Sequence, residues 1–155
     1  MRLLQRLVAE ESGASVIELA LVAPVFASML VGMVDLSRAY SAKLQLEQAA
    51  QRSIEKVQQY QTTSNTFSTL QTEASNAATA AGFTSPTVTV DYWLECDGAR
   101  QSDYDSHCST GQSYGRWVTV DIAGKYTPMF ASRHWPGANS DGTFTLHGKA
   151  GLRTQ

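Results

Sequence analysis

The residues that could carry out chemistry lie in two separate parts of this 155-residue sequence. The C-terminal half contains two cysteines, three histidines and an acidic loop, whereas the N-terminal part has one carboxylate, Glu18, inside an apolar run. Cys96 and Cys108 enclose a mainly polar stretch. In an oxidising compartment this pair predicts one disulfide that closes a loop and contributes about 3 kcal/mol of stability. A metal or redox pair would need CxxC-type spacing or nearby ligands, and only His107 is adjacent.

The other polar candidates form no recognisable catalytic or metal-binding motif. The histidines are His107, His134 and His147. They lack metal-ligand spacing such as HExxH, and the sequence has no GxSxG elbow, P-loop or GxGxxG. We therefore expect a protein that is not an enzyme and has no catalytic residue, no cofactor and no bound metal. A net charge of -2 without a Lys/Arg cluster also argues against a nucleic-acid partner.

Two further groups of residues could bind a ligand, and both have a simpler explanation. Asp97, Asp103 and Asp105 could hold Ca²⁺, but they do not follow the EF-hand order, so a solvated acidic loop is the simpler interpretation. Three tryptophans could line a sugar-binding surface: Trp93, Trp117 and Trp135. The first two fall in predicted strands, where packing in the core or on the sheet surface is the more usual role.

Glu18 stands out because it lies near the start of a run long enough to cross a membrane. Residues 14–34 read ASVIELALVAPVFASMLVGMV and would form a helix of about 31 Å, which matches a bilayer core. A carboxylate costs roughly 3 kcal/mol at the bilayer centre and less near an end, so protonation or snorkelling is the simplest explanation. If a peptidase cut after Gly13, the new amino group of Ala14 would lie about 6 Å from Glu18 along the helix axis, on the same face. Glu18 could then neutralise that amine in its own chain or in a neighbouring subunit.

The residues around Glu18 resemble a known processing and assembly signal. A polar leader, Gly13, four residues, Glu18 and an apolar run make up the pattern of type IV pilin-like prepilins. Pro24 stands inside the run, and residues 35–40 read DLSRAY, an acidic-x-x-Arg exit. Over residues 10–40 the sequence is similar to the TadE-like family of pilus assembly proteins, with Leu19 where the family more often has Phe.

This resemblance implies a structural protein, namely a minor pilin or pseudopilin that takes part in assembly or priming of a Tad-type, type IV-like pilus. Gly13 and Ala14 would form the processing site of a prepilin peptidase, and Glu18 and Pro24 would act in assembly. The implied partners are other pilin subunits, the pilus-assembly machinery, the peptidase and membrane lipid. The implied location is the bacterial inner membrane, as a single-pass protein with its C-terminal domain in the periplasm or, within a pilus, at the cell surface.

Three parts of the chain are expected. They are a cytoplasmic leader over residues 1–13, a transmembrane helix over residues 14–34, and a periplasmic or extracellular pilin-like domain over residues 35–155. The alternative function is a binding module, anchored or secreted, that recognises a glycan or another envelope protein.

A competing cleavage would make that module soluble. Residues 25–27 fit the small-x-small rule of ordinary signal peptidase, and a cut there would release a domain that begins at Ser28. Against this cut, apolar residues continue to Val34 and Glu18 interrupts the hydrophobic region.

Periodicity predicts an α+β fold, to which the cysteine pair adds one disulfide. Apolar residues at helical spacing continue towards Gln59, so one helix of about 45 residues and about 68 Å would begin at Ala14. A second helix is predicted over Thr66–Ala81, ending at Gly82. Alternating residues then predict three strands: from Pro86 to about Leu94, Trp117–Tyr126 and Thr143–Leu152. A small antiparallel sheet of about three strands would pack on the helices, and the cysteine loop would join its first two strands.

Overall fold

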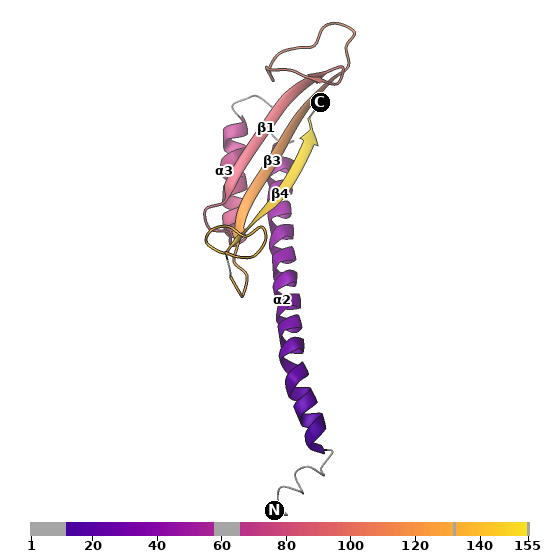
Figure 1. The fold of residues 1–155 in the computed structure, drawn as a ribbon. Coiled ribbons are helices and arrows are strands. Elements are labelled where there is room, and N and C mark those ends of the chain that lie inside the picture. The colour runs from indigo at the N-terminus through magenta and orange to yellow at the C-terminus, as the bar shows by residue number, and fades with distance from the viewer. Residues whose placement is uncertain (1–11, 58–65, 132, 155) are drawn as a thin grey trace, which may run out of the picture. The chain divides into compact units, whose positions relative to one another are not determined.

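The computed structural model describes residues 12–57, 66–131 and 133–154. It contains two helices and four strands in these ranges (Figure 1): α2 (Ser12–Val57), α3 (Thr66–Ala80), β1 (Thr87–Cys96), β2 (Ala99–Arg100), β3 (Tyr114–Tyr126) and β4 (Phe144–Arg153). The chain divides into two compact units, residues 1–38 and residues 39–155, so that α2 contributes to both.

Helix α2 confirms the prediction of one long helix that continues beyond the apolar run. It includes Pro24 in its interior, where the ring removes one backbone donor. Near this point the Ser28 hydroxyl donates a 2.7 Å hydrogen bond to the Val25 carbonyl. Residues 58 and 59, to which the prediction extended, lie outside the described residues. In the first unit, all the large apolar side chains from Val16 to Val34 that the structure describes are exposed or nearly so.

The second helix ends where the sequence predicted. Gly82 has a φ of 97°, a left-handed conformation that suits glycine, and the Phe83 amide donates to the Ala78 carbonyl over 3.1 Å. This is the Schellman arrangement that closes many helices, and the side chain of Phe83 is buried beneath it. The chain is thereby turned back towards β1.

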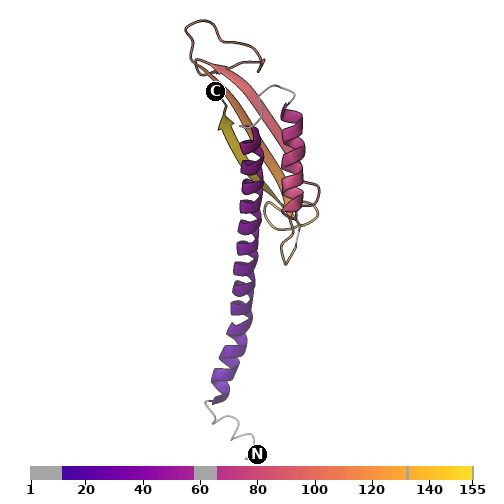
Figure 2. The same cartoon turned by 180° about the vertical axis from the view of Figure 1, so that it is seen from behind.

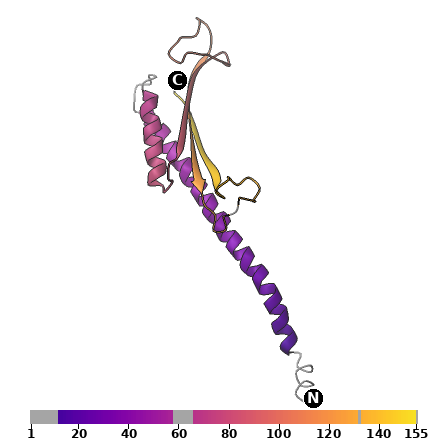
Figure 3. The same ribbon diagram turned by 60° about the vertical axis from the view of Figure 1, so that its left-hand side comes forward.

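The four strands form one antiparallel sheet in the order β2-β1-β3-β4. Strands β1, β3 and β4 confirm the three predicted strands, and β3 begins three residues earlier than expected. Strand β2 was not predicted. It has two residues and pairs with the end of β1 through a tight turn at Asp97 and Gly98. Figures 2 and 3 show α3 and the last part of α2 on one face of this sheet, while its other face carries no helix.

The core lies between the sheet and the two helices of the second unit. Even-numbered residues of β1 and β3 point into it, because successive side chains of a strand point to opposite faces. The buried strand residues are Val88, Leu94, Val118, Val120 and Ile122. The buried helix residues are Leu46, Ala49, Ala50, Ile54, Phe67, Leu70, Ala74 and Ala78. Small alanines on both helices let these helices approach the sheet closely.

The closest approach is at Gly148 in β4. A Cβ atom placed there would overlap the backbone of Leu46 and Glu47 in α2. The helix backbone therefore lies directly against the strand at this point, which only a residue without a side chain allows. Gly124 in β3 provides similar space, since a Cβ there would overlap the ring of Phe83.

Candidate functional sites on the helix and the sheet

The N-terminal residues predicted to act in processing and assembly all lie on α2. Gly13 and Ala14 are within the helix, and Glu18 follows on its exposed surface. By length and composition, the described part of α2 contains a candidate membrane span, and none of its most apolar 18-residue window is buried. A core helix of a soluble domain would be mostly buried, so this segment instead has the character of a membrane span or of a signal sequence.

The two cysteines form the predicted disulfide. Cys96 at the end of β1 is bonded to Cys108, with a Cα–Cα distance of 5.6 Å. The bond closes the segment between β1 and β3, which correspond to the first two predicted strands, and the short β2 lies within this segment. Both cysteines are thus used structurally.

The disulfide loop is fixed to the rest of the second unit by an aromatic cluster. The buried Tyr104 of the loop packs edge-on against Phe67 of α3 and Tyr92 of β1, at ring-centroid distances of 5.2 and 5.5 Å. Arg116 of β3 donates hydrogen bonds to the carbonyls of Tyr104 and Ser106 over 3.2 and 3.0 Å. The loop is therefore held at both ends and in its middle.

The acidic residues of this loop serve its own backbone. The carboxylate of Asp97 accepts hydrogen bonds from the amide and hydroxyl of Ser113, at 2.9 and 3.0 Å, and these bonds lower the pKa of Asp97. Asp103 accepts a hydrogen bond from the amide of Asp105 at 3.0 Å. Among the described residues, no cluster of three or more His, Cys, Asp or Glu side chains could hold a metal ion.

Two of the three tryptophans lie side by side on the open face of the sheet. Trp93 and Trp117 are direct partners across β1 and β3, and their rings stack with centroids 6.3 Å apart. The guanidinium of Arg100 covers Trp93 at 4.6 Å and forms two hydrogen bonds with Asp91, at 3.0 and 2.6 Å. This pairing raises the pKa of Arg100. The ring of Trp93 thus lies between a guanidinium and a second indole, which leaves it poorly suited to stack on a sugar.

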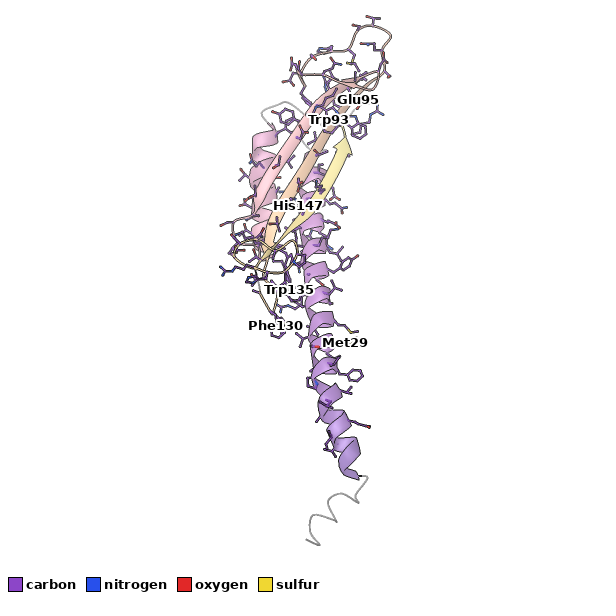
Figure 4. All side chains as sticks on the ribbon, viewed as in Figure 1. Met29, Trp93, Glu95, Phe130, Trp135 and His147 are labelled. Carbon is purple, nitrogen blue, oxygen red and sulfur yellow. A yellow bond between two sulfur atoms is a disulfide. The ribbon has the colours of Figure 1, made fainter. Side chains whose placement is uncertain are left out.

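Trp135 is separate from this pair. It is exposed on the loop between β3 and β4, at the opposite end of the sheet from Trp93 (Figure 4). The three tryptophans therefore do not form one surface, and the sugar-binding surface considered from the sequence is not assembled.

The same open face carries a charged group centred on Asp121. Its carboxylate lies 2.9 Å from His147 Nδ1 and 3.0 Å from Lys149 Nζ, both in β4. Burial by itself raises the pKa of Asp121, but the hydrogen bonds and charges of His147 and Lys149 outweigh burial and lower it. Above this group lies a shallow depression of about 450 Å³, lined by Thr89, Asp91, Thr119, Val120, Asp121, Lys149, Ala150 and Gly151.

Neither group on the open face, the Trp93–Trp117 pair or the charged group centred on Asp121, was predicted from the sequence, because each joins residues of different strands. Asp121 and Lys149 are partners in the β3–β4 register, and His147 is one diagonal step away. The sequence shows only which residues of one strand share a face, because residues two apart in a strand point to the same side of the sheet. His107 and His134 are exposed in loops, so the described structure unites neither of them with His147.

These features define a class of protein: an exposed apolar N-terminal helix that continues into a disulfide-bonded α+β unit. Comparison with known proteins then shows which family the N-terminal part of the chain resembles. The family of TadE-like proteins matches residues 13–54, which confirms the resemblance over the helix that contains Glu18 and Pro24. This match supports involvement in Tad pilus assembly. No curated protein and no solved structure matches the chain.

Proposed function

We propose that this chain is a minor pilin or pseudopilin that takes part in assembly or priming of a Tad-type pilus. The observation that carries the proposal is the apolar segment of α2, which exposes its side chains along its length and falls within the TadE-like match. A helix that buries none of its apolar surface within its own chain needs lipid or other helices around it. A pilin uses both environments in turn, first the membrane and then neighbouring subunits.

Processing would create the second element of the mechanism. A prepilin peptidase cuts after Gly13, removes residues 1–13 and leaves Ala14 with a free amino group. Glu18 lies four residues further along the same helix, so its carboxylate can pair with this amine or with that of a neighbouring subunit. Inside an apolar environment such a pair offsets the cost of each isolated charge.

The remaining parts of the proposal concern location and partners. Residues 14–34 span the inner membrane, and residues 35–155 form a domain in the periplasm, where a disulfide can form and persist. Pro24 lowers the helical hydrogen bonding of the span and allows a local change of helix geometry during packing against other subunits. The partners are other pilin subunits, the assembly machinery and the peptidase.

One observation favours the alternative of a membrane-anchored binding module. The depression on the open face of the sheet is lined by charges of both signs, from Asp91, Asp121 and Lys149. A polar glycan or an envelope protein could bind there. In that case the apolar part of α2 would serve only as an anchor.

The experiment compares the wild-type chain with Glu18→Ala in a bacterium that assembles the pilus. We expect the membrane-fraction protein to begin at Ala14 by N-terminal sequencing and intact mass. Glu18→Ala should be expressed and cut normally but should reduce pilus number by roughly tenfold or more, because loss of the pair leaves an amine uncompensated in an apolar environment. Glu55→Ala is the matched control, because Glu55 is an exposed carboxylate on the same helix.

Three results would contradict the proposal. A start at Ser28 would indicate a secreted domain, and a retained Met1 would indicate an unprocessed anchor. Normal pilus number in Glu18→Ala would remove the role assigned to its carboxylate.

A further inference from the structure

The loop between β3 and β4 carries an unusual concentration of large apolar side chains at the surface. Met129, Phe130 and Trp135 are 52%, 66% and 56% exposed, and they lie within seven consecutive residues. Large aromatic residues scattered singly at a surface are normal, but a local group of them marks an interaction site. Figure 4 shows Phe130 and Trp135 on this loop at one end of the sheet.

The base of the loop is fixed, so this exposure is a property of a folded element. Lys125 forms a 2.6 Å salt bridge with Asp141, and the carboxylate of Asp141 also accepts hydrogen bonds from the amide and hydroxyl of Thr143. Asn139 donates from its side-chain amide to the hydroxyls of Thr143 and Thr145, at 3.0 and 3.1 Å. These bonds hold the two ends of the loop together and present the apolar residues beyond them.

The charges of the loop indicate which surface it fits. The only carboxylate between Lys125 and Phe144 is Asp141, and Lys125 already neutralises it, whereas Arg133 adds an exposed guanidinium beside the apolar residues. A tryptophan, a phenylalanine and an arginine together are typical of segments that lie at the interface between lipid headgroups and acyl chains.

The position of the loop within the second unit agrees with this partner. In Figure 1, β4 runs in the same direction as the part of α2 that packs on the sheet, so the loop before β4 lies at the end of the sheet where that part of α2 begins. The proposed span, residues 14–34, ends shortly before Ala39 in the same helix, so lipid would lie a few residues away along the chain. The opposite end of the sheet holds the disulfide loop, in which polar residues predominate.

We propose that the loop of residues 127–138 inserts Phe130 and Trp135, with Met129, into the interface of an anionic phospholipid membrane. The guanidinium of Arg133 binds lipid phosphate at the same depth. The loop is then a second membrane contact in addition to the span, and it holds the sheet against the bilayer until the subunit leaves the membrane. The inference rests on the proposed span, because the span brings the loop to the membrane.

The test uses the full chain reconstituted in vesicles of phosphatidylethanolamine and phosphatidylglycerol whose acyl chains are brominated close to the headgroup. Bromine quenches tryptophan fluorescence only on close approach, and the chain has three tryptophans. We expect quenching in the wild type, its loss in Trp135→Phe, and its persistence in Trp93→Phe, the matched control at the other end of the sheet. Met129→Ser combined with Phe130→Ser should weaken the quenching of Trp135 while the disulfide still forms.

The possible outcomes distinguish membrane insertion of the loop from membrane insertion of the span. Equal quenching of wild type and Trp135→Phe, or no quenching of either, would overturn the proposal. An emission shift of Trp135 that depends on protein concentration but not on bromine would instead assign the loop to a second copy of the chain, and would equally overturn it. Met129→Ser combined with Phe130→Ser should still float with the vesicles through the span, so failure of the span is recognised separately.

Discussion

The charged residues of the open sheet face are paired across strands, with Asp121 at the centre. Its carboxylate contacts both His147 and Lys149, and the side chain of Asp121 is 31% exposed. Asp141 is held by Lys125 and Thr143 in the same way, and these bonds lower the pKa of Asp141 well below its usual range. Each of these carboxylates is therefore more acidic in the folded chain than in the unfolded chain.

We expect a small loss of stability in acid from Asp121. Because its folded pKa is lowered, its contribution is present above the ordinary aspartate value of about 3.9 and is lost as pH falls through the folded pKa. A partly exposed pair of this kind contributes at most about 1 kcal/mol. Thermal unfolding of the detergent-solubilised chain, followed by circular dichroism between pH 5 and pH 2, would measure the effect. Asp121→Asn should have a shallower acid slope than the wild type.

Asp105→Asn is the control for this measurement, because Asp105 is an exposed loop carboxylate that forms no ion pair with the described residues. It should keep the wild-type slope. If Asp121→Asn also kept that slope, the contacts with His147 and Lys149 would contribute nothing to stability.

At the scale of elements, the second unit depends on how closely α2 packs against β4. The helix backbone at Leu46 meets the strand at Gly148, and Leu46 itself is fully buried. A strand glycine normally weakens a sheet, because it packs no side chain and loses more entropy on folding. Here that cost is offset by the close contact of helix and strand.

Replacing this glycine should separate the two elements. A Cβ in Gly148→Ala would meet backbone atoms, which cannot rotate away as a flexible side chain can, so we expect a loss of about 1–3 kcal/mol in unfolding free energy. Chemical denaturation of the purified full chain would measure it. Gly151→Ala is the matched control, since Gly151 is exposed in the same strand. A Cβ there would lie 3.2 Å from the Thr119 side chain and 3.8 Å, an ordinary contact distance, from the Val118 carbonyl oxygen. Equal stabilities of the two variants would show that α2 can shift without cost.

Elements with a strong local pattern could be predicted from the sequence. The long α2 follows from the apolar run of residues 14–34 and from the helical spacing of residues 37–57, which contain no Gly or Pro. The end of α3 follows from Gly82. Alternation located β1, β3 and β4. Strand β2 is too short to show any alternation, although Asp97-Gly98 is the turn signal that could have revealed it.

The sites were predictable to different degrees for a physical reason. The disulfide needs only two cysteines and a permissive loop, and the structure forms it. The pairing of Asp121 with His147 spans 26 positions and depends on the strand register, which sequence patterns alone do not fix. Gly148, inside a predicted strand, is a sequence signal of close backbone approach, but its partner in α2 is 102 residues away and no local pattern identifies it.

At the scale of the whole chain, two units share one helix. The first unit is the exposed apolar segment with Glu18, and the second is the α+β unit that begins at Ala39. The TadE-like match covers both the apolar segment and the part of α2 that packs on the sheet. The match therefore extends beyond a simple anchor.

A helix exchange would test whether the apolar segment does more than anchor. We replace residues 14–34 by an unrelated apolar helix of equal length and expect loss of pilus assembly, because side-by-side packing requires this particular surface. Formation of the Cys96–Cys108 disulfide, measured by thiol labelling, would confirm that the second unit still folds. Normal function after the exchange would favour the binding module over the pilin.

The disulfide has a consequence for the order of events during biogenesis. With the proposed topology, Cys96 and Cys108 would stay reduced while the chain is in the cytosol, so the loop that carries Tyr104 would not yet be covalently closed there. The polypeptide can therefore be threaded through a translocation channel before this crosslink forms. In a chain with the proposed topology, oxidation after translocation then acts as a one-way step: once the crosslink has formed, the second unit is harder to unfold and pull back.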